Sequence, residues 1–400
     1  MFDNIQEAVA YIEGKRHKRT VEEFRKTLES LQINMAQKNM IHIGGTNGKG
    51  STVNYLRAIL NAHGYRVGTF TSPYLVCHND RIRIDDEPIS DDDLLKYINR
   101  FYDVIEREDM SMFEIDVMIM LAYFDEQDLD YRIIECGIGG KNDKTNVIDS
   151  TLSAITNIGL DHLEQIGPTL YDVINEKMGI IQPHQIFVTS EISGTIIARL
   201  QEQCDVMEAL MVVVPEYDVD EYPITFAYRN MFFKLKTNGI YQATNARLAL
   251  TIAHKLITLN PTLTVPAVED AIWQGRYEEL SYNGKRVVID GAHNIPAIES
   301  LIKSIKFDDG HPAIVFSCLK EKSAESMVSL LQNAGLFVYL TTFDDERVID
   351  LSEIVTNDIQ KVVPDYRAAI KEASSQYDYV IVTGSLHFIS IVRRFLQEMK

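Results

Sequence analysis

The sequence predicts an α/β protein of two domains, with a larger N-terminal domain on a mainly parallel sheet and a smaller C-terminal α/β domain. Three observations favour this fold. From Met40 onward, short apolar runs alternate with longer segments of helical periodicity, which is the pattern of helices packed on a parallel sheet. Between residues 224 and 241 the period changes to two, which predicts a small antiparallel excursion. The chain has 400 residues, more than one hydrophobic core usually supports.

The N-terminal domain begins with an explicit strand–loop–helix unit. Residues 40–43 predict a strand, residues 44–50 a tight loop, and residues 51–63 a helix that ends at Gly64. A long apolar helix is expected at residues 113–124. Further strands are predicted at residues 66–70, 131–136, 154–158 and 186–189.

The C-terminal domain repeats the alternation of strand and helix. A helix begins near Ala243, and strands are predicted at residues 286–290, 313–317, 336–341 and 379–383. We place the boundary near residues 276–285. The predicted organisation is therefore an N-terminal domain at 1–276, a linker at 277–285 and a C-terminal domain at 286–400.

Composition excludes several classes of protein. A formal net charge of -19 argues against nucleic acid as a partner, because binding a phosphate backbone needs a basic face. No stretch reaches the roughly 18 apolar residues of a membrane span, and the N-terminus lacks the apolar core of a signal peptide. The four cysteines are widely spaced, which predicts reduced thiols rather than a zinc site or disulfides. We expect a cytoplasmic protein that does not bind membranes.

A glycine-rich loop lies between the first predicted strand and helix. Its glycines let backbone N–H groups approach phosphates, and Lys49 neutralises their charge. The loop differs from a plain Walker A sequence, because Gly50 separates Lys49 from Ser51. A turn without a ligand is the alternative, and the flanking strand and helix disfavour it. We predict a catalytic role for Lys49 and nucleotide contacts from Thr46, Asn47, Gly48, Lys49, Gly50 and Ser51.

Other candidate residues carry weaker signals. Glu135 ends an apolar strand, at the end where ligands bind in open α/β sheets, and its carboxylate suits Mg²⁺. Its alternative is a solvated strand-end glutamate, which the three following glycines disfavour. Without further context, His162 reads as an exposed loop histidine, Lys177 as a solvated helix lysine and Arg276 as a surface arginine.

An ordered series of motifs resembles the folylpolyglutamate synthases and dihydrofolate synthases, members of the Mur ligase superfamily. Residues 45–51 resemble their nucleotide loop, and residues 135–147 resemble their E-V-G-x-G-G-x-x-D-x-T-N-V block. The other matching segments are 71–84, 113–114, 175–180, 241–246, 273–278, 290–294 and 383–386. This resemblance implies a P-loop-type N-terminal domain and a Rossmann-like, glutamate-binding C-terminal domain.

The chain departs from the family pattern at several positions. Tyr241 replaces a histidine, Gln274 replaces a proline, and the proline expected after Asn294 is displaced to Pro296. The segment 72–84 carries Cys77, His78 and Asp80 at unusual identities. In the loop 319–323 only Lys322 matches the family.

The resemblance assigns roles to individual residues. It implies that Mg²⁺ is bound at two sites by Ser72, Glu135 and His162, and that Lys177 is carbamylated. The implied nucleotide contacts outside the loop are Gln242, Asn245, Arg276 and Asp290. The implied catalytic residues are Lys49, Lys177, Arg276, Asp290 and His293. The implied substrate contacts are Ser72, Pro73, Tyr74, Arg81, His293, Lys322 and Ser385.

The implied activity is that of an ATP- and Mg²⁺-dependent ligase. ATP would convert an acceptor carboxylate into an acyl phosphate, which the amine of L-glutamate would attack. The acceptor implied by the resemblance is a reduced folate, dihydropteroate, or both, and the chain is expected to act as a monomer on small molecules. Two alternatives stay open: a ligase that adds an amino acid to a cell-wall nucleotide-peptide, and a non-catalytic nucleotide-binding module.

Overall fold

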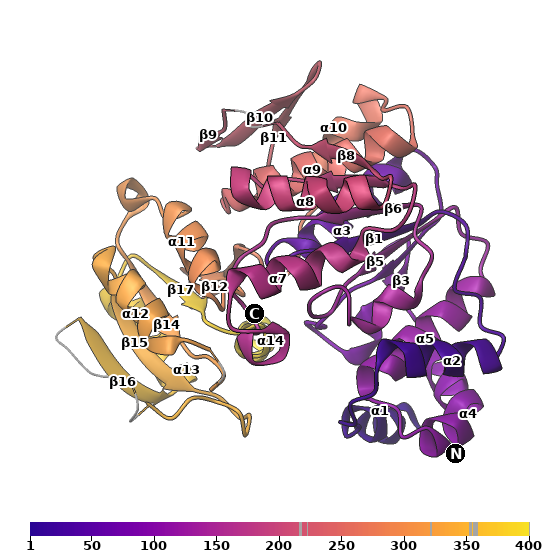
Figure 1. Ribbon diagram of the computed structural model, residues 1–400. Helices are drawn as coiled ribbons and strands as arrows, with labels where there is room; N and C mark the ends of the chain where they lie inside the picture. The colour runs from indigo at the N-terminus through magenta and orange to yellow at the C-terminus, as the bar shows by residue number, and fades with distance from the viewer. Residues whose placement is uncertain (216–217, 222, 321, 352–353, 355–358, 400) are drawn as a thin grey trace. The chain divides into compact units, whose positions relative to one another are not determined.

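The computed structural model describes residues 1–400 apart from 216–217, 222, 321, 352–353, 355–358 and 400. The chain divides into two compact units, coloured from indigo to pink and from orange to yellow over most of their length (Figure 1). Unit 1 comprises Met1–Asp218, Phe226–Phe233 and Thr244–Ala271. Unit 2 comprises Val219–Thr225, Lys234–Ala243 and Ile272–Lys400. The predicted two-part α/β architecture is confirmed.

Unit 1 is built on an eight-stranded sheet in the order β4-β3-β2-β5-β1-β6-β7-β8. The six strands from β2 to β8 in that order are parallel, and β3 and β4 add antiparallel edge strands. The strands are β1 (Met40–Gly44), β2 (Val67–Phe70), β3 (Ile82–Ile84), β4 (Glu87–Pro88), β5 (Tyr131–Glu135), β6 (Leu152–Ile155), β7 (Ile186–Thr189) and β8 (Leu210–Val213). Because β1 lies between β5 and β6, its carboxyl end is a topological switch point, where ligands bind in such sheets.

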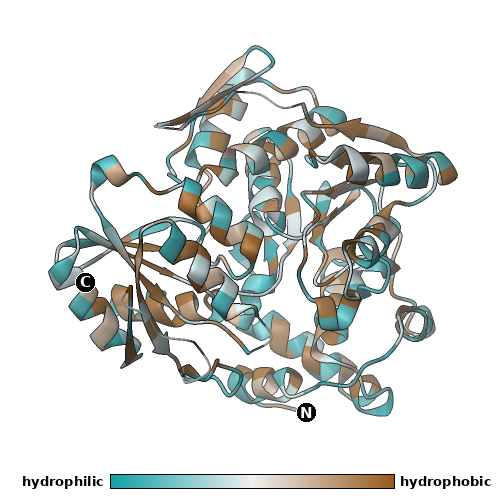
Figure 2. Ribbon diagram, turned by 60° about the vertical axis from the view of Figure 1, so that its left-hand side comes forward, coloured by the Kyte–Doolittle hydropathy of each residue, from teal (hydrophilic) through white to brown (hydrophobic). Residues whose placement is uncertain are grey.

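The helices of unit 1 bury apolar side chains against this sheet. α3 (Lys49–Ala62) follows β1, and α5 (Met112–Asp125) is buried along almost its whole length. The other α-helices are α1 (Ile5–Glu13), α2 (Val21–Ser30), α4 (Asp91–Arg107), α6 (Leu163–Ile166), α7 (Leu170–Lys177), α8 (Gly194–Val206), α9 (Tyr241–Leu256), which begins in unit 2, and α10 (Pro261–Asp270). Figure 2 shows hydrophobic residues recurring along the strands and on one side of many helices.

The predicted antiparallel excursion is a three-stranded sheet in the order β11-β10-β9. It consists of β9 (Asp220–Glu221), β10 (Ile224–Tyr228) and β11 (Met231–Lys234). In β11 the side chains alternate between buried and exposed, which is the period of two that the sequence shows.

Unit 2 contains a six-stranded sheet in the order β12-β13-β17-β14-β15-β16. All its strands are parallel except β12. The strands are β12 (Glu278–Tyr282), β13 (Lys285–Ile289), β14 (Pro312–Phe316), β15 (Phe337–Thr342), β16 (Gln360–Asp365) and β17 (Tyr379–Thr383). The helices are α11 (Ile295–Lys303), α12 (Ala324–Asn333), α13 (Tyr366–Gln376) and α14 (Leu386–Glu398).

The interval 277–285, which the sequence analysis assigns to a linker, contains β12 and a tight turn. β12 pairs with β13 through a turn at Asn283 and Gly284, whose φ angles are 49° and 77°. Two consecutive residues with positive φ define the hairpin turn that Asn-Gly favours. The last segment of unit 1 ends at Ala271, and the last segment of unit 2 begins at Ile272.

Two further expectations concern cysteines and membranes. All four cysteines are free, with Cys77 exposed and the other three buried. Among the residues described, no helix is both long and apolar enough to cross a membrane.

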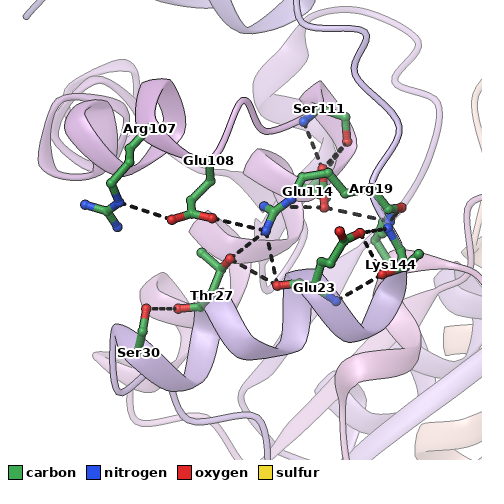
Figure 3. Close-up of polar contacts among 10 residues, drawn as sticks. Arg19, Glu23, Thr27, Ser30, Arg107, Glu108, Ser111, Glu114 and Lys144 are labelled. Atoms are coloured by element: carbon green, nitrogen blue, oxygen red, sulfur yellow. Dashed lines mark hydrogen bonds and ion pairs between the residues drawn. The ribbon is translucent and has the colours of Figure 1, made fainter.

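A buried ionic cluster joins α5 to the segments on either side of it (Figure 3). Glu114 is fully buried, and its Oε2 accepts hydrogen bonds from the Ser111 N–H (2.9 Å) and Oγ (2.8 Å). Its Oε1 lies 3.7 Å from Lys144 Nζ and 3.8 Å from Arg19 Nη1. Arg19 also reaches Glu108 Oε2 at 3.4 Å. One carboxylate therefore balances two cations that are largely removed from water.

We expect Glu114→Ala to lower the free energy of unfolding by about 3–5 kcal/mol, because it leaves buried cations without their counterion. Glu108→Ala is the matched control, since Glu108 pairs with the same arginine at a side chain that is 33% exposed. That change should cost less than about 1 kcal/mol. Urea unfolding followed by circular dichroism measures both values, and equal losses would contradict the role given to Glu114.

Candidate functional site

The loop after β1 ends at the N-terminus of α3. Gly48 is the N-cap, with a left-handed φ of 86°, and Lys49 is the first helical residue. The helix thus begins two residues earlier than the sequence analysis predicted, because this glycine turns the chain directly into it. The unpaired N–H groups and positive dipole end of α3 are provided at the switch point of the sheet, where they suit an anion.

Residues that follow β6 hold this loop in place. Asn157 forms a reciprocal pair with the backbone of Asn47: its Oδ1 accepts from Asn47 N at 3.0 Å, and its Nδ2 donates to Asn47 O at 3.0 Å. Thr156 Oγ1 also donates to Asn47 O at 2.6 Å. The Thr46 hydroxyl is engaged in the same way with the backbone of Gly159, at 3.0 Å and 2.9 Å. Sequence reasoning missed Asn157, although a polar Thr-Asn pair directly after a buried strand is the signal that marks it.

Two glycines permit close approaches that no other residue would allow. A Cβ at Gly45, where φ is 137°, would lie 1.9 Å from Thr156 Oγ1. A Cβ at Gly48 would lie 2.2 Å from Asn245 Oδ1. Asn245 of α9, a predicted nucleotide contact, therefore lies against the loop.

Two lysines converge on one carbonyl of the loop. Lys49 Nζ donates to Gly45 O (3.1 Å) and Thr46 O (3.3 Å), and Lys177 Nζ donates to Gly45 O at 2.9 Å. Lys177 is only 5% exposed, so it is not the solvated helix lysine that its sequence suggests in isolation. Burial and, secondarily, the charge of Lys49 lower the pKa of Lys177 to about 7.

Glu135 and Ser72 lie together at the same edge of the sheet. Glu135 ends β5, is 4% exposed, and accepts a hydrogen bond from the Ser72 N–H at 3.2 Å. Mg²⁺ prefers oxygen ligands and usually takes one or two protein carboxylates together with phosphate oxygens. The carboxylate of Glu135 and the hydroxyl group of Ser72 are ligands of this kind. His162 precedes α6 with a φ of 53°, and its Nε2 lies 3.8 Å from Asp161 Oδ2. Within the described part of the chain, no three His, Cys, Asp or Glu side chains form a ready-made metal cage.

The glycine-rich segment after β5 is fixed by Glu176, a residue that sequence reasoning did not single out. Its carboxylate accepts from Asn142 N at 2.7 Å and from Asn142 Nδ2 at 2.8 Å. A Cβ at Gly139 or Gly140 would lie 2.7 Å from atoms of Glu176. Since Lys177 is the next residue, the same turn of α7 fixes this segment and brings an amine to the glycine-rich loop after β1.

Four predicted substrate contacts lie on the segment 72–81. Pro73 is exposed, Ser72 and Tyr74 are half-buried, and Arg81 is buried. The peptide bond between Ser72 and Pro73 is cis. Tyr74 and Arg81 also contact two carboxylates, Glu13 of α1 and Asp116 of α5 respectively.

In unit 2, Asp290 brings three predicted segments together. Its Oδ1 accepts from Ala292 N at 2.9 Å, and its Oδ2 accepts from Tyr277 N at 2.9 Å and from the Tyr241 hydroxyl. Arg276 Nη1 lies against Gly291, 2.5 Å from where a Cβ would stand. Burial raises the pKa of Asp290, and the charge of Arg276 opposes that shift. Tyr241 thus keeps a polar contact where the resembling family has histidine.

The remaining predicted residues of unit 2 occupy separate elements. His293 Nδ1 lies 2.8 Å from Gly291 O, and Gln242 is buried near the start of α9. Ser385 is the N-cap of α14. Lys322 N donates to Leu319 O at 3.1 Å, whereas Glu321 of the same loop lies outside the described residues. The roles of these residues stay predictions.

These features define a class: an α/β protein in which a glycine-rich loop opens a helix at the switch point of a parallel sheet, beside a strand-end carboxylate. The Mur ligase middle domain matches residues 43–253, and the Mur ligase glutamate ligase domain matches residues 275–386. The chain belongs to the Mur ligase family. This match agrees with the resemblance inferred from its motifs.

Similar proteins span nearly the whole chain. A dihydrofolate synthase/folylpolyglutamate synthase of Bacillus subtilis is 29% identical over 431 residues, covering 99% of this chain and 100% of that protein. The crystal structure of a folylpolyglutamate synthase (FPGS) from Thermotoga maritima is 29% identical, with a TM-score of 0.82 over 99% of this chain and 97% of that one. An FPGS–AMPPCP–folate complex is 27% identical, with a TM-score of 0.84 over 98% of this chain and 99% of that one.

Proposed function

We propose that this protein is an ATP-dependent ligase that adds L-glutamate to a folate carboxylate through an acyl phosphate. The observation that carries the proposal is the similarity to folylpolyglutamate and dihydrofolate synthases over both units, with nearly complete coverage of both chains. One solved relative is a complex with an ATP analogue and folate. The phosphate loop, which is the glycine-rich loop of residues 44–50, supplies with Lys49 and the N-terminus of α3 the local positive charge that an anionic substrate requires.

The reaction has to overcome the poor leaving ability of a carboxylate oxygen. A carboxylate oxygen of the acceptor attacks the γ-phosphorus of ATP, and ADP leaves. The amine of glutamate then attacks the acyl carbon, phosphate leaves with the carboxylate oxygen, and the amine loses a proton. Lys49 and the N-terminus of α3 stabilise the charge on the phosphoryl oxygens, and we assign Arg276 to the γ-phosphate.

Other residues position the reactants. We assign Ser72, Glu135 and His162 to Mg²⁺, which when bound supplies positive charge at the phosphate oxygens. Asn245 lies against Gly48 and limits where a nucleotide can extend beside the loop. Asp290 fixes the segment that carries His293, a proposed substrate contact, and its neighbour Arg276.

The buried amine of Lys177 favours carbamylation. Carbon dioxide reacts only with a neutral amine, and a pKa of about 7 makes a large fraction of Lys177 neutral at pH 7. We expect the modified fraction to rise as pH increases through 7, and Lys177→Ala to lower the rate by on the order of 10²-fold. Crystals or mass spectra at saturating bicarbonate measure the modification. A bare amine under those conditions, or full activity of Lys177→Ala, would contradict it.

A three-acceptor assay tests the proposed function. Mg-ATP and labelled glutamate are supplied with a reduced monoglutamyl folate, with dihydropteroate, or with a nucleotide-linked muramyl peptide, and the products are separated by chromatography and mass. We expect label on the reduced folate, and label on dihydropteroate as well would make the enzyme bifunctional. Label on the muramyl peptide alone would establish a cell-wall ligase. ATP binding without turnover on any acceptor would establish a non-catalytic module.

A further inference from the structure

A buried histidine joins the segment 72–81 to two helices of unit 1. His78 Nδ1 lies 3.0 Å from Glu13 Oε1 of α1, and His78 Nε2 lies 2.8 Å from Asp116 Oδ1 of α5. His78 and Asp116 are 5% and 2% exposed. Ionised carboxylates only accept hydrogen bonds, so both ring nitrogens donate when both pairs form, and the ring is then an imidazolium.

Two more side chains of the same segment complete this cluster. The Tyr74 hydroxyl donates to Glu13 Oε1 at 2.7 Å. Arg81 Nε lies 3.4 Å from Asp116 Oδ2, and its guanidinium lies 5.3 Å from the centre of the Tyr74 ring. The cluster therefore contains two carboxylates, Glu13 and Asp116, and two cations, His78 and Arg81. This balance offsets the cost of removing charges from water.

The cluster and the candidate site share the same short segment. Ser72 N is bonded to Glu135 at one end of the segment, and Thr71 N donates to Arg81 O at 2.9 Å where the segment returns. Tyr74 is bonded to Glu13 in between. Ser72 and Pro73 therefore lie between two fixed points, the hydrogen bond to Glu135 and the contacts of the cluster.

We propose that His78 is a positioning residue of the ligase: by bridging Glu13 and Asp116 it fixes the segment 72–81, and so places Ser72, Pro73 and Tyr74 for the carboxylate acceptor. This deepens the proposed function and rests on it for the identity of the acceptor. It also accounts for a departure that the sequence shows, since His78 stands at an unusual identity and has two carboxylate partners. The hydrogen bonds of the His78 ring run to α1 and α5, so a change at His78 should affect binding of the acceptor and not of ATP.

The bridge should persist at neutral pH. Burial alone would lower the pKa of His78, but the Asp116 charge and the hydrogen bonds to Asp116 and Glu13 outweigh it and raise that pKa to about 9. Arg81 is the nearby cation that opposes the rise. A raised folded-state pKa gives stability that is complete below the ordinary value of 6.5 and is lost as pH rises through about 9. The acceptor KM of the wild-type enzyme should accordingly be flat near neutrality and rise above pH 9.

The kinetic test compares His78→Phe with His63→Gln. His63 is a histidine of unit 1 whose ring contacts the backbone of Ile59 and Asn260 and the Thr264 hydroxyl, away from the segment 72–81. We expect His78→Phe to raise the acceptor KM by about 10- to 100-fold, the scale for displaced positioning groups, with the ATP KM unchanged. His63→Gln should leave both KM values unchanged. An unaltered acceptor KM in folded His78→Phe, or an equal rise in both KM values, would overturn the proposal.

Two measurements on the protein without substrates test whether His78 fixes the segment 72–81, independently of the ligase activity. Hydrogen exchange should be faster for the amides of residues 72–81 in His78→Phe, and NMR should give His78 a pKa of about 9 that falls in Glu13→Gln. Glu13→Gln also replaces His78→Phe if the latter does not fold. If the wild-type protein uses no acceptor, the proposed function fails, but these two measurements still show whether His78 fixes the segment 72–81. Unchanged exchange and an unshifted His78 pKa would refute that role of His78.

Discussion

Lys49→Ala is expected to abolish ligation, with a loss of at least about 10³-fold in rate, while the protein stays folded. Lys49 is half-buried at the start of α3, and its Nζ donates hydrogen bonds to the loop carbonyls of Gly45 and Thr46. Its removal deletes a cation at the phosphoryl group, and losses of this size follow the removal of such a charge. ADP release in the presence of acceptor and glutamate measures the effect.

Two controls separate this loss from a general one. Lys255→Ala removes an exposed lysine from α9 of the same unit and should retain full activity. A thermal melt of Lys49→Ala should match the wild type closely, because no core contact is lost. The pKa of Lys177 should rise in this variant, since the charge of Lys49 contributes to lowering it. Normal ligation by folded Lys49→Ala would remove the assignment of the phosphate loop.

The central strands could be predicted from the sequence because burial on both faces makes them continuous apolar runs. β1, β5 and β14 are buried at every position and were all expected. The edges of the sheets were not. β4 is exposed and two residues long, and β16 is mostly exposed, so neither carries an apolar signal. β12 alternates between exposed and half-buried positions up to its buried last residue, Tyr282, and it was assigned to a linker.

The site shows the same division between local and tertiary information. The phosphate loop and Glu135 could be predicted because their chemistry follows directly from a strand end. Asn157 and Glu176 could not, because each acts by bonding the backbone of a distant segment, 110 and 34 residues away respectively. The burial of Lys177 is likewise tertiary, since its partner carbonyl is 132 residues away. A single sequence does not show which of its distant segments come into contact.

The cluster around His78 illustrates how an unusual residue gains meaning from partners elsewhere in the chain. Its two carboxylates come from α1 and α5, 65 and 38 residues away. The same holds for Tyr241, whose hydroxyl bonds Asp290 across 49 residues. In both cases the residue that departs from the family pattern forms a hydrogen bond to a specific carboxylate. The structure therefore gives each of these two residues a defined contact.

Glu135→Ala should either eliminate activity or raise the Mg²⁺ concentration for half-maximal rate by at least about 10- to 100-fold, and His162→Ala should act in the same direction. Losses of that size in metal affinity or activity follow from changing residues that only hydrogen-bond to a metal ligand. Removing a ligand itself should therefore cause a loss at least as large. Asp130→Asn is the matched control, because Asp130 is a carboxylate just before β5, at the strand end opposite to Glu135, where it accepts from Arg66 N at 2.8 Å. Magnesium titrations of the rate and of ADP binding should shift in the two site variants and not in the control. Since Glu135 also holds Ser72 N, Glu135→Gln tests the charge while retaining an acceptor for that bond. Unchanged titrations in both Glu135→Ala and His162→Ala would refute the metal assignment, whereas a shift in Glu135→Ala alone would confine it to the site that Glu135 and Ser72 form.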